Sequence, residues 1–268
     1  MSDRPAGRPR EVRPSATGAR ARHLWPSLGA LTLLSYNTWL LWRPLNIRPA
    51  IFDGYLSELS ASDQPYSFFF RGGDLITAVI VLALAGRTIV LSRRRTAAVA
   101  ERGGPRPGRW WVVAWSALLI FGVSTFFDAF FAMDCSPTLS ETCRVAEETG
   151  RLSTIHYAHT FTSVGAQVGI VASMIATAIA MVRAPRPSRT RTRVVIAIAA
   201  FEVVALVVMM IMLVLRMPGL GYPQAVMVVV ASLWFAAIGF QLVGEDAVPR
   251  RRAGTSTSGP PLVGSDHG

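Results

Sequence analysis

The sequence has no lysine and few charged residues of any kind. Asp, Glu, Lys and Arg together make up 16% of the 268 residues, whereas a typical soluble domain carries about 25%. The formal net charge of +11 therefore comes entirely from arginine. This composition argues against an ordinary soluble domain. The all-arginine basic charge, in a chain rich in Ala and Val, is typical of a GC-rich bacterial genome.

The sequence also lacks the features of a nucleic-acid-binding protein. Its arginines lie in short runs beside apolar blocks, as the cytoplasmic flanks of membrane helices do. Basic and aromatic residues do not alternate as they do in proteins that bind single strands. The expected partner is a lipid bilayer, with anionic lipids at its cytoplasmic face. No nucleic acid is expected, and the sequence identifies no protein partner.

Hydrophobic residues make up 51% of the chain and are concentrated in six blocks. Each block is close to the ~20 residues that cross a hydrocarbon core about 30 Å thick. The predicted fold is therefore an all-α, polytopic membrane bundle of six transmembrane helices within residues 23–243. The six predicted spans are residues 24–42, 68–91, 110–133, 152–182, 194–215 and 224–243.

The placement of the arginines predicts the orientation of the six spans. Both terminal segments and the linkers after the second and fourth spans lie on one side and hold most of the arginines. Because cytoplasmic loops carry the excess of Arg and Lys, both termini are predicted to be cytoplasmic. Segments 1–22 and 244–268 lack apolar residues for a core, so we expect disordered cytoplasmic tails. The expected location is the bacterial cytoplasmic membrane.

The only two cysteines, Cys135 and Cys143, lie in the loop between the third and fourth predicted spans. The predicted orientation places this loop outside the cell, where disulfides persist, and the short spacing closes a small loop easily. A bridge here would contribute roughly 2–3 kcal/mol, mostly by restricting the unfolded chain. We predict a disulfide. The alternatives are a metal site shared with nearby histidines and a reactive thiol.

The segment between the first two predicted spans, residues 43–65, mixes acidic and apolar side chains. Asp53, Glu58 and Asp63 alternate with residues such as Phe52 and Leu56. This mixture predicts a short amphipathic helix that lies on the membrane surface.

Several polar side chains fall inside the predicted spans, where a charged group costs at least ~2.5 kcal/mol on insertion scales. They come from four spans and lie at one depth near the outer face. Neighbours at helical spacing extend the same faces. We therefore predict an outward-facing polar pocket. Its candidate residues are Asn37, Arg71, Asp74, Ser124, Asp128, His156, His159 and Ser163.

The sequence leaves three roles open for this cluster. Asp74, Asp128, His156 and His159 offer ligands for a divalent metal, which would supply Lewis-acid or activated-water chemistry. The second role is binding of a lipid head group or small ligand without chemistry. The third is a structural network, with Asp128 bonded to a histidine and Arg71 paired with Asp74. Apart from such a metal no cofactor is expected, and whether the protein is an enzyme stays open.

A second charged pair lies nearer the predicted cytoplasmic face. Arg87 belongs to the second predicted span and Glu202 to the fifth. We predict a buried ion pair that fixes helix packing. A proton or ion path is the alternative, but only Gln167 and Thr77 lie on the route across the midplane.

Five motifs carry a family resemblance: SYNTWLLWRPLN, DGYLSELSASDQP, FFFRGGDL, FFDAFFAMDC and HYAHTFTS. They resemble the bacterial integral-membrane family known as domain of unknown function 998 (DUF998), over roughly residues 24–243. The resemblance implies a six-helix membrane protein of unassigned activity. It also implies a distant similarity to the Frag1/DRAM/Sfk1 group, some members of which are linked to lipid remodelling.

The chain is also partly similar to the alkaline-ceramidase-like transmembrane hydrolases, which combine a serine, an aspartate and three zinc-binding histidines over seven spans. The residues that match in part are Ser124, Asp128, His156 and His159. The other two histidines, His23 and His267, lie at the inner end of the first predicted span and in the C-terminal tail. This similarity supplies an alternative function, a metal-dependent transmembrane hydrolase acting on a lipid or amide at the outer face.

Overall fold

The computed structural model describes residues 16–47, 52–101, 108–185 and 187–246. These residues form seven α-helices joined by loops and short 3-10 helices, without a β-strand, which confirms the all-α class for them. In chain order the elements are α1 (Ala16–Ser35), η1 (Thr38–Trp42), η3 (Leu56–Ser60), α2 (Ser67–Ala100), α3 (Arg109–Asp128), α4 (Glu141–Glu148), α5 (Thr154–Val182), α6 (Arg189–Val214) and α7 (Gly221–Asp246).

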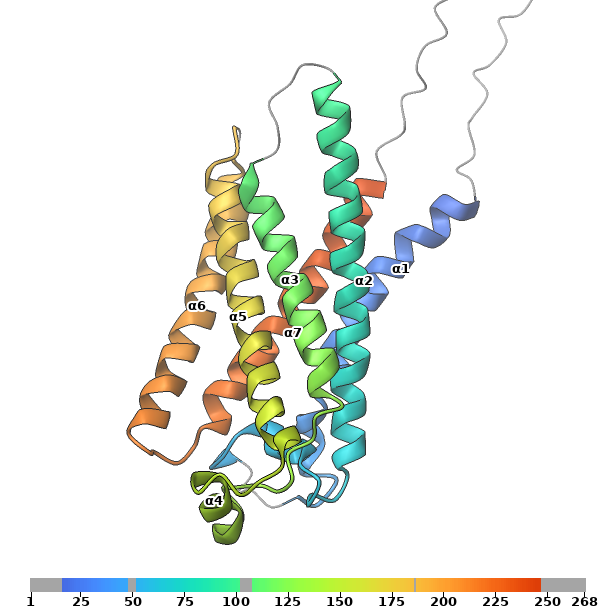
Figure 1. Ribbon diagram of the computed structural model, residues 1–268. Helices are drawn as coiled ribbons and strands as arrows, with labels where there is room; N and C mark the ends of the chain where they lie inside the picture. The colour runs from blue at the N-terminus through green and yellow to red at the C-terminus, as the bar shows by residue number, and fades with distance from the viewer. Residues whose placement is uncertain (1–15, 48–51, 102–107, 186, 247–268) are drawn as a thin grey trace, which may run out of the picture.

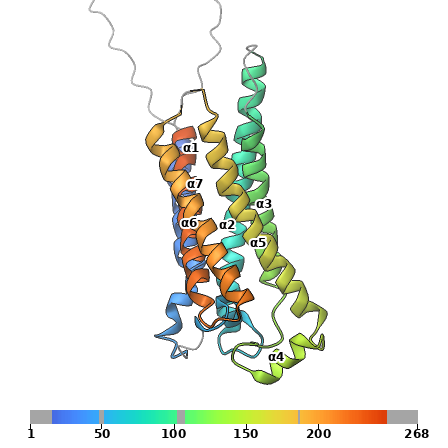
Figure 2. The ribbon, with the colours of Figure 1, turned by 90° about the vertical axis from the view of Figure 1, so that its left-hand side faces the viewer.

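Six long helices run along the molecule, and the short α4 lies across one end together with the 3-10 helices (Figures 1 and 2). We call this the loop end. At the opposite end, the terminal end, α1 begins and α7 ends. Helix α3 packs against α5 and α2, and α1 packs against α7. Within the described parts of the chain, five helices are long and apolar enough to cross a membrane, namely α2, α3, α5, α6 and α7.

The interior and the outer surface of the bundle are both apolar. Phe121 and Phe235 are buried at its centre, with ring centroids 4.8 Å apart. On the outside, Phe161 and Val214 keep 77% and 79% of their surface exposed. Exposed apolar side chains at this density suit a surface that faces lipid rather than water.

Glycines allow two helix pairs to approach closely. A Cβ atom on Gly169 of α5 would lie 2.6 Å from the backbone nitrogen of Phe121 in α3. A Cβ atom on Gly239 of α7 would lie 2.5 Å from the carbonyl oxygen of Trp25 in α1. Small residues serve this purpose at helix contacts in membranes, because dispersion contacts there replace the hydrophobic effect as the driving force.

The first predicted span is divided in the structure. Helix α1 begins at Ala16, inside the segment predicted to be disordered, and ends at Ser35. The early start is consistent with the helix propensity of Ala and Arg in residues 16–22. At the other end, the Asn37 side chain donates to the carbonyl of Leu33 at 3.1 Å and so competes with the next helical bond. Residues 1–15 and 247–268, the rest of the predicted tails, lie outside the described residues.

The predicted surface helix in residues 43–65 does not form within the described part of that segment. The described part, which includes residues 52–65, contains the five-residue 3-10 helix η3 with turns and bends on both sides. The polar groups of this segment bond to a distant loop instead of to their helical neighbours, as described below. Tertiary hydrogen bonds therefore take the place of the local ones that an amphipathic helix needs.

Candidate polar cavity at the loop end

A cavity of about 110 Å³ lies inside the bundle near the loop end. Helices α2, α3, α5 and α7 form its walls together with Tyr36 and η1, and η3 lines it from the loop side. Its volume suffices for several water molecules or a small polar group. Its polar and acidic lining comprises Tyr36, Thr38, Ser57, Ser60, Asp74, Thr125, Asp128, Ser163, Gln167 and Gln224. Of the eight predicted pocket residues, Asp74, Asp128 and Ser163 line it.

Asp128 is held in place by the neighbouring helix α5. Its Oδ1 atom accepts hydrogen bonds from Ser163 Oγ at 3.0 Å and from Thr162 Oγ1. His159 Nδ1 lies 3.3 Å from the same oxygen and 2.8 Å from the carbonyl oxygen of Phe131. A proton on Nδ1 serves both acceptors, so the histidine joins the carboxylate to the chain beyond α3. The predicted contact between Asp128 and a histidine is present.

Asp74 also lines the cavity, but its surroundings differ. Among the residues that the structure describes, its carboxylate has no hydrogen bond and no ion pair. Arg71, predicted to pair with it, instead donates from Nε to the carbonyl of Ala129 at 2.8 Å and from Nη2 to that of Phe130 at 3.4 Å. The predicted Arg71–Asp74 pair is therefore wrong: the arginine is drawn to the free carbonyls at the end of α3.

The predicted metal set of Asp74, Asp128, His156 and His159 is not brought together. His156 is fully buried, but its Nδ1 accepts from the backbone N–H of Asp134 at 3.1 Å, and its Nε2 lies 3.3 Å from Glu147. The ring therefore serves the loop before α5 and not the cavity. Within the described residues, no group of three or more His, Cys, Asp or Glu side chains is arranged to hold a metal.

Two further predicted pocket residues have packing roles. Asn37 donates to Ser232 Oγ at 2.8 Å and accepts from Trp39 Nε1 at 3.2 Å, which joins the end of α1 to α7. Ser124 lies against Gly165, whose Cβ, if present, would sit 2.6 Å from the serine oxygen. Neither residue lines the cavity.

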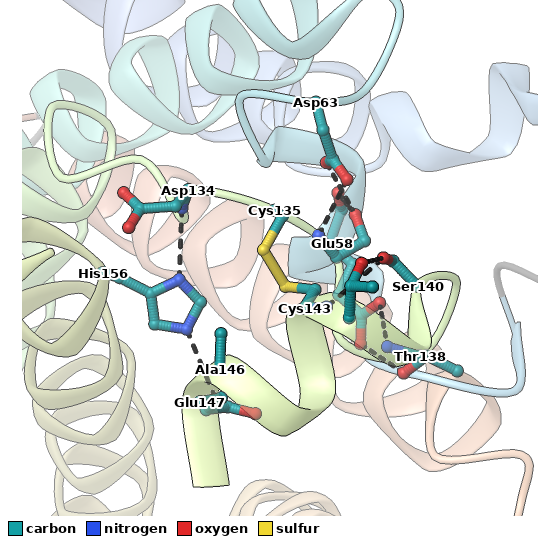
Figure 3. Close-up of a disulfide and its surroundings, with 12 residues drawn as sticks. Glu58, Asp63, Asp134, Cys135, Thr138, Ser140, Cys143, Ala146, Glu147 and His156 are labelled. Carbon is teal, nitrogen blue, oxygen red and sulfur yellow. Dashed lines mark hydrogen bonds and ion pairs between the residues drawn. A yellow bond between two sulfur atoms is a disulfide. The ribbon is translucent and has the colours of Figure 1, made fainter. Parts of the chain in front are cut away.

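The predicted disulfide between Cys135 and Cys143 is confirmed. Figure 3 shows the bridge between the start of the loop and α4, with carboxylates on both sides. Asp134 accepts from Ser153 N at 2.7 Å and from Ser153 Oγ at 2.6 Å, at the beginning of α5. The bridged segment is thereby tied to the fourth predicted span. We call residues 134–153 the cysteine loop.

Two carboxylates from the segment between η1 and α2 bond this segment, which includes η3, to the cysteine loop. Glu58 accepts from Thr138 Oγ1 at 2.5 Å and from Thr138 N at 3.2 Å (Figure 3). Asp63 accepts from the backbone N–H of Ser136 at 3.0 Å and from its hydroxyl at 3.1 Å. Burial raises the pKa of Glu58 above its usual value, while the Thr138 hydrogen bonds oppose part of that rise.

A hydrogen bond also ties η3 to the last helix. The backbone N–H of Leu56 donates to Gln224 Oε1 at 2.6 Å. The element that lines the cavity from the loop side is therefore fixed on two sides, by Gln224 of α7 and by Thr138 and Ser136 of the cysteine loop. Sequence reasoning missed Gln224, which follows Pro223 at the beginning of α7. A polar side chain at a span end beside a Gly-Tyr-Pro turn was the available signal.

The structure does not bring Arg87 and Glu202 together, contrary to the predicted ion pair. The Arg87 guanidinium lies 5.7 Å from the Trp25 ring centroid, a cation–π arrangement. Glu202 is fully buried in α6, and its Oε1 accepts from Gln167 Nε2 at 3.0 Å. Its Oε2 has no hydrogen-bond partner among the described residues. Because Gln167 also lines the cavity, Glu202 is connected to the cavity through this amide.

The family model described as "Protein of unknown function (DUF998)" matches residues 27–241. The chain belongs to the DUF998 family. No curated protein and no solved structure matches it. The family match and the apolar helices together establish this DUF998 protein as a multi-pass membrane protein. The distant similarity to the Frag1/DRAM/Sfk1 group stays a prediction.

Proposed function

We propose that this DUF998 protein crosses a bacterial cytoplasmic membrane six times, with α1 as the first span and both termini in the cytoplasm. The apolar block of residues 24–42 runs from α1 through η1 and has about the length of one crossing, and α1 packs closely along α7. The ends of α2 and α5 and the starts of α3 and α6 lie together at the terminal end. Arginines in these segments support a cytoplasmic, anionic-lipid-facing location for that end: Arg93, Arg94, Arg95, Arg109, Arg183, Arg189, Arg191 and Arg193.

Reporter fusions test this topology. A reporter that is active only in the periplasm, fused after residue 188, should be silent, and the same reporter inserted after Glu141 in α4 should be active. The reverse pattern would overturn the orientation, and matching signals at both positions would overturn the single crossing by α5 between them.

We further propose that the cavity opens to the outer face and binds a small polar ligand or a lipid head group. The observation that carries this proposal is the Asp74 carboxylate, which faces the cavity without a protein partner. Asp74 is only partly exposed, and carboxylates inside a helix bundle usually have hydrogen-bond or ion partners, because an isolated ionised group in a medium of low dielectric constant is strongly disfavoured. A bound ligand would supply the missing partner. The hydrolase alternative gains no support, because His156 belongs to a separate network.

Native mass spectrometry of the protein extracted into lipid nanodiscs tests ligand binding. We expect a co-purifying small molecule or specific lipid on the wild type, and a large loss of occupancy in Asp74→Asn. Glu141→Gln is the matched control, because it removes an exposed carboxylate of α4 at the same end of the molecule. Equal occupancy in all three proteins would assign the ligand elsewhere, and an empty wild type that also binds no added probe would contradict the proposal.

A further inference from the structure

We propose that the group bound in this cavity is a protonated amine. This inference rests on the proposed function, since it names the chemical class of the ligand. The first observation is the charge of the lining. Two carboxylates, Asp74 and Asp128, line the cavity, and its lining residues include no arginine and no histidine. A phosphate or carboxylate ligand would meet only negative charge there, at a short distance and in a poorly screened environment.

The two carboxylates are not equivalent toward a ligand. Asp128 already receives two hydroxyl hydrogen bonds and lies beside His159 Nδ1. Asp74 receives none within the described residues, so its charge is the uncompensated one. An ammonium group placed against Asp74 satisfies that charge and donates hydrogen bonds at the same time. Charge-assisted bonds of this kind are about twice as strong as neutral ones.

A second, independent observation is an unpartnered hydroxyl in the same wall. Thr125 is only 4% exposed, lines the cavity, and its Oγ1 has no hydrogen-bond partner among the described residues. Gln167 adds an amide whose Nε2 already donates to Glu202, which leaves its oxygen to accept. An ammonium group carries several N–H donors on one centre. The wall therefore offers the acceptors that such a group needs.

The apolar part of the lining fits the same ligand class. Aromatic rings of Tyr36, Trp39, Phe70 and Phe121 line the cavity, and aromatic faces attract cations. The small volume, about 110 Å³, favours a primary amine over a bulky one. An ethanolamine-like group meets these requirements, whether it is free in solution or forms the head group of a lipid. Protonation of Asp74 is the alternative to a bound amine, because a proton would also neutralise the charge of this carboxylate.

Thermal unfolding of the full-length protein in nanodiscs of phosphatidylglycerol tests the proposal. The probes are ethanolamine, inorganic phosphate and glycerol, at constant ionic strength. We expect a saturable rise of the unfolding midpoint with ethanolamine alone. Asp74→Asn should weaken the apparent ethanolamine affinity at least about tenfold, whereas Glu141→Gln should match the wild type. A second set of nanodiscs containing phosphatidylethanolamine separates the sources: stabilisation there without an effect of the free amine assigns the amine to the lipid.

The outcomes distinguish this inference from the proposed function. Phosphate or glycerol binding that depends on Asp74, without any effect of either amine source, would retain a ligand cavity and overturn the amine. An absence of binding by every probe, together with no co-purifying ligand, would overturn both and leave the proton as the neutralising group. If Asp74→Asn does not fold, Thr125→Val replaces it. This nearly isosteric change should weaken ethanolamine binding several-fold, and unchanged affinity would contradict the proposal.

Discussion

The carboxylates at the loop end fall into two groups. Glu58, Asp63 and Asp134 lie in the cysteine loop or bind to it, and Asp74 and Asp128 line the cavity. Glu58, Asp63 and Asp134 each accept at least two hydrogen bonds from the segment opposite. Asp74, a short distance away in the bundle, accepts none within the described part of the chain. Acidic residues at one end of the molecule thus differ in role: the first three hold backbone segments together, and Asp74 does not within the described residues.

The largest effect is expected from removing the bridge that orders the first group. Cys135→Ser should lower the free energy of unfolding of the cysteine loop by roughly 2–3 kcal/mol, because the unfolded loop regains conformational entropy. Hydrogen exchange of residues 134–153 measures this change. Cys143→Ser should give the same result, since either change removes the same bond. Alkylation of both thiols in the untreated protein would show that no bridge forms.

Substitutions of the two cavity aspartates separate a bonded carboxylate from an unbonded one. Asp128→Asn should destabilise the protein by about 1.5–3 kcal/mol, since it weakens bonds from Thr162, Ser163 and His159 to a charged acceptor. Asp74→Asn should leave stability unchanged or raise it, because it removes a desolvated charge without breaking a bond. Chemical denaturation in detergent micelles without added amine measures both. An equal loss of stability in Asp128→Asn and Asp74→Asn would contradict the difference in bonding between the two carboxylates.

Within the first group, Asp63→Asn tests the fastening of the cysteine loop. The loss of charge weakens two bonds to Ser136, and a decrease in stability of about 1–2 kcal/mol is expected. The backbone amide of Ser136 should exchange faster in the variant. Glu141→Gln, on the exposed face of α4, serves as control and should leave that exchange rate unchanged. Protection that persists at Ser136 in Asp63→Asn would show that other contacts hold the loop.

The smallest effect concerns pH. Burial and the charge of Glu147 raise the pKa of Glu58, so the folded protein binds this proton more tightly than the unfolded chain does. The stability from Glu58 is complete below its ordinary value of 4.5 and is lost as the pH rises through the raised folded value. Glu58→Gln should flatten this part of the pH dependence of the unfolding midpoint. An identical profile in the variant would remove Glu58 as its source.

The sequence predicted the helical class and most spans well, because long apolar blocks require little more than their length. It also predicted the disulfide, since two cysteines in one short loop have few other partners. Among the residues that the structure describes, five of the long helices have the length and apolar composition of a membrane span. Helix α1 was harder to delimit, because its end depends on a single side-chain bond from Asn37 to the chain one turn earlier.

The site was predicted only in part, because a sequence indicates how deep a side chain lies in the membrane but not the direction in which it points around its helix. Depth along the membrane can be read from the position of a residue in its span, and Asp74 and Asp128 were placed at one level in this way. The direction of a side chain around the helix depends on which acceptors are nearby. His156 and Arg71 share that depth, but the first is held by the cysteine loop and the second by the end of α3. The contribution of η3 depends on bonds to distant segments, for which the sequence has no local pattern.

The attachment of η3 on two sides, to Gln224 and to Thr138 and Ser136 of the cysteine loop, has a kinetic consequence. If the proposed ligand enters from the loop side of the cavity, one of these bonds has to open first. The bonds themselves do not touch the acceptors deeper inside. Reduction of the disulfide should therefore shorten the residence time of a bound amine and speed its entry by a similar factor, with little change in its dissociation constant.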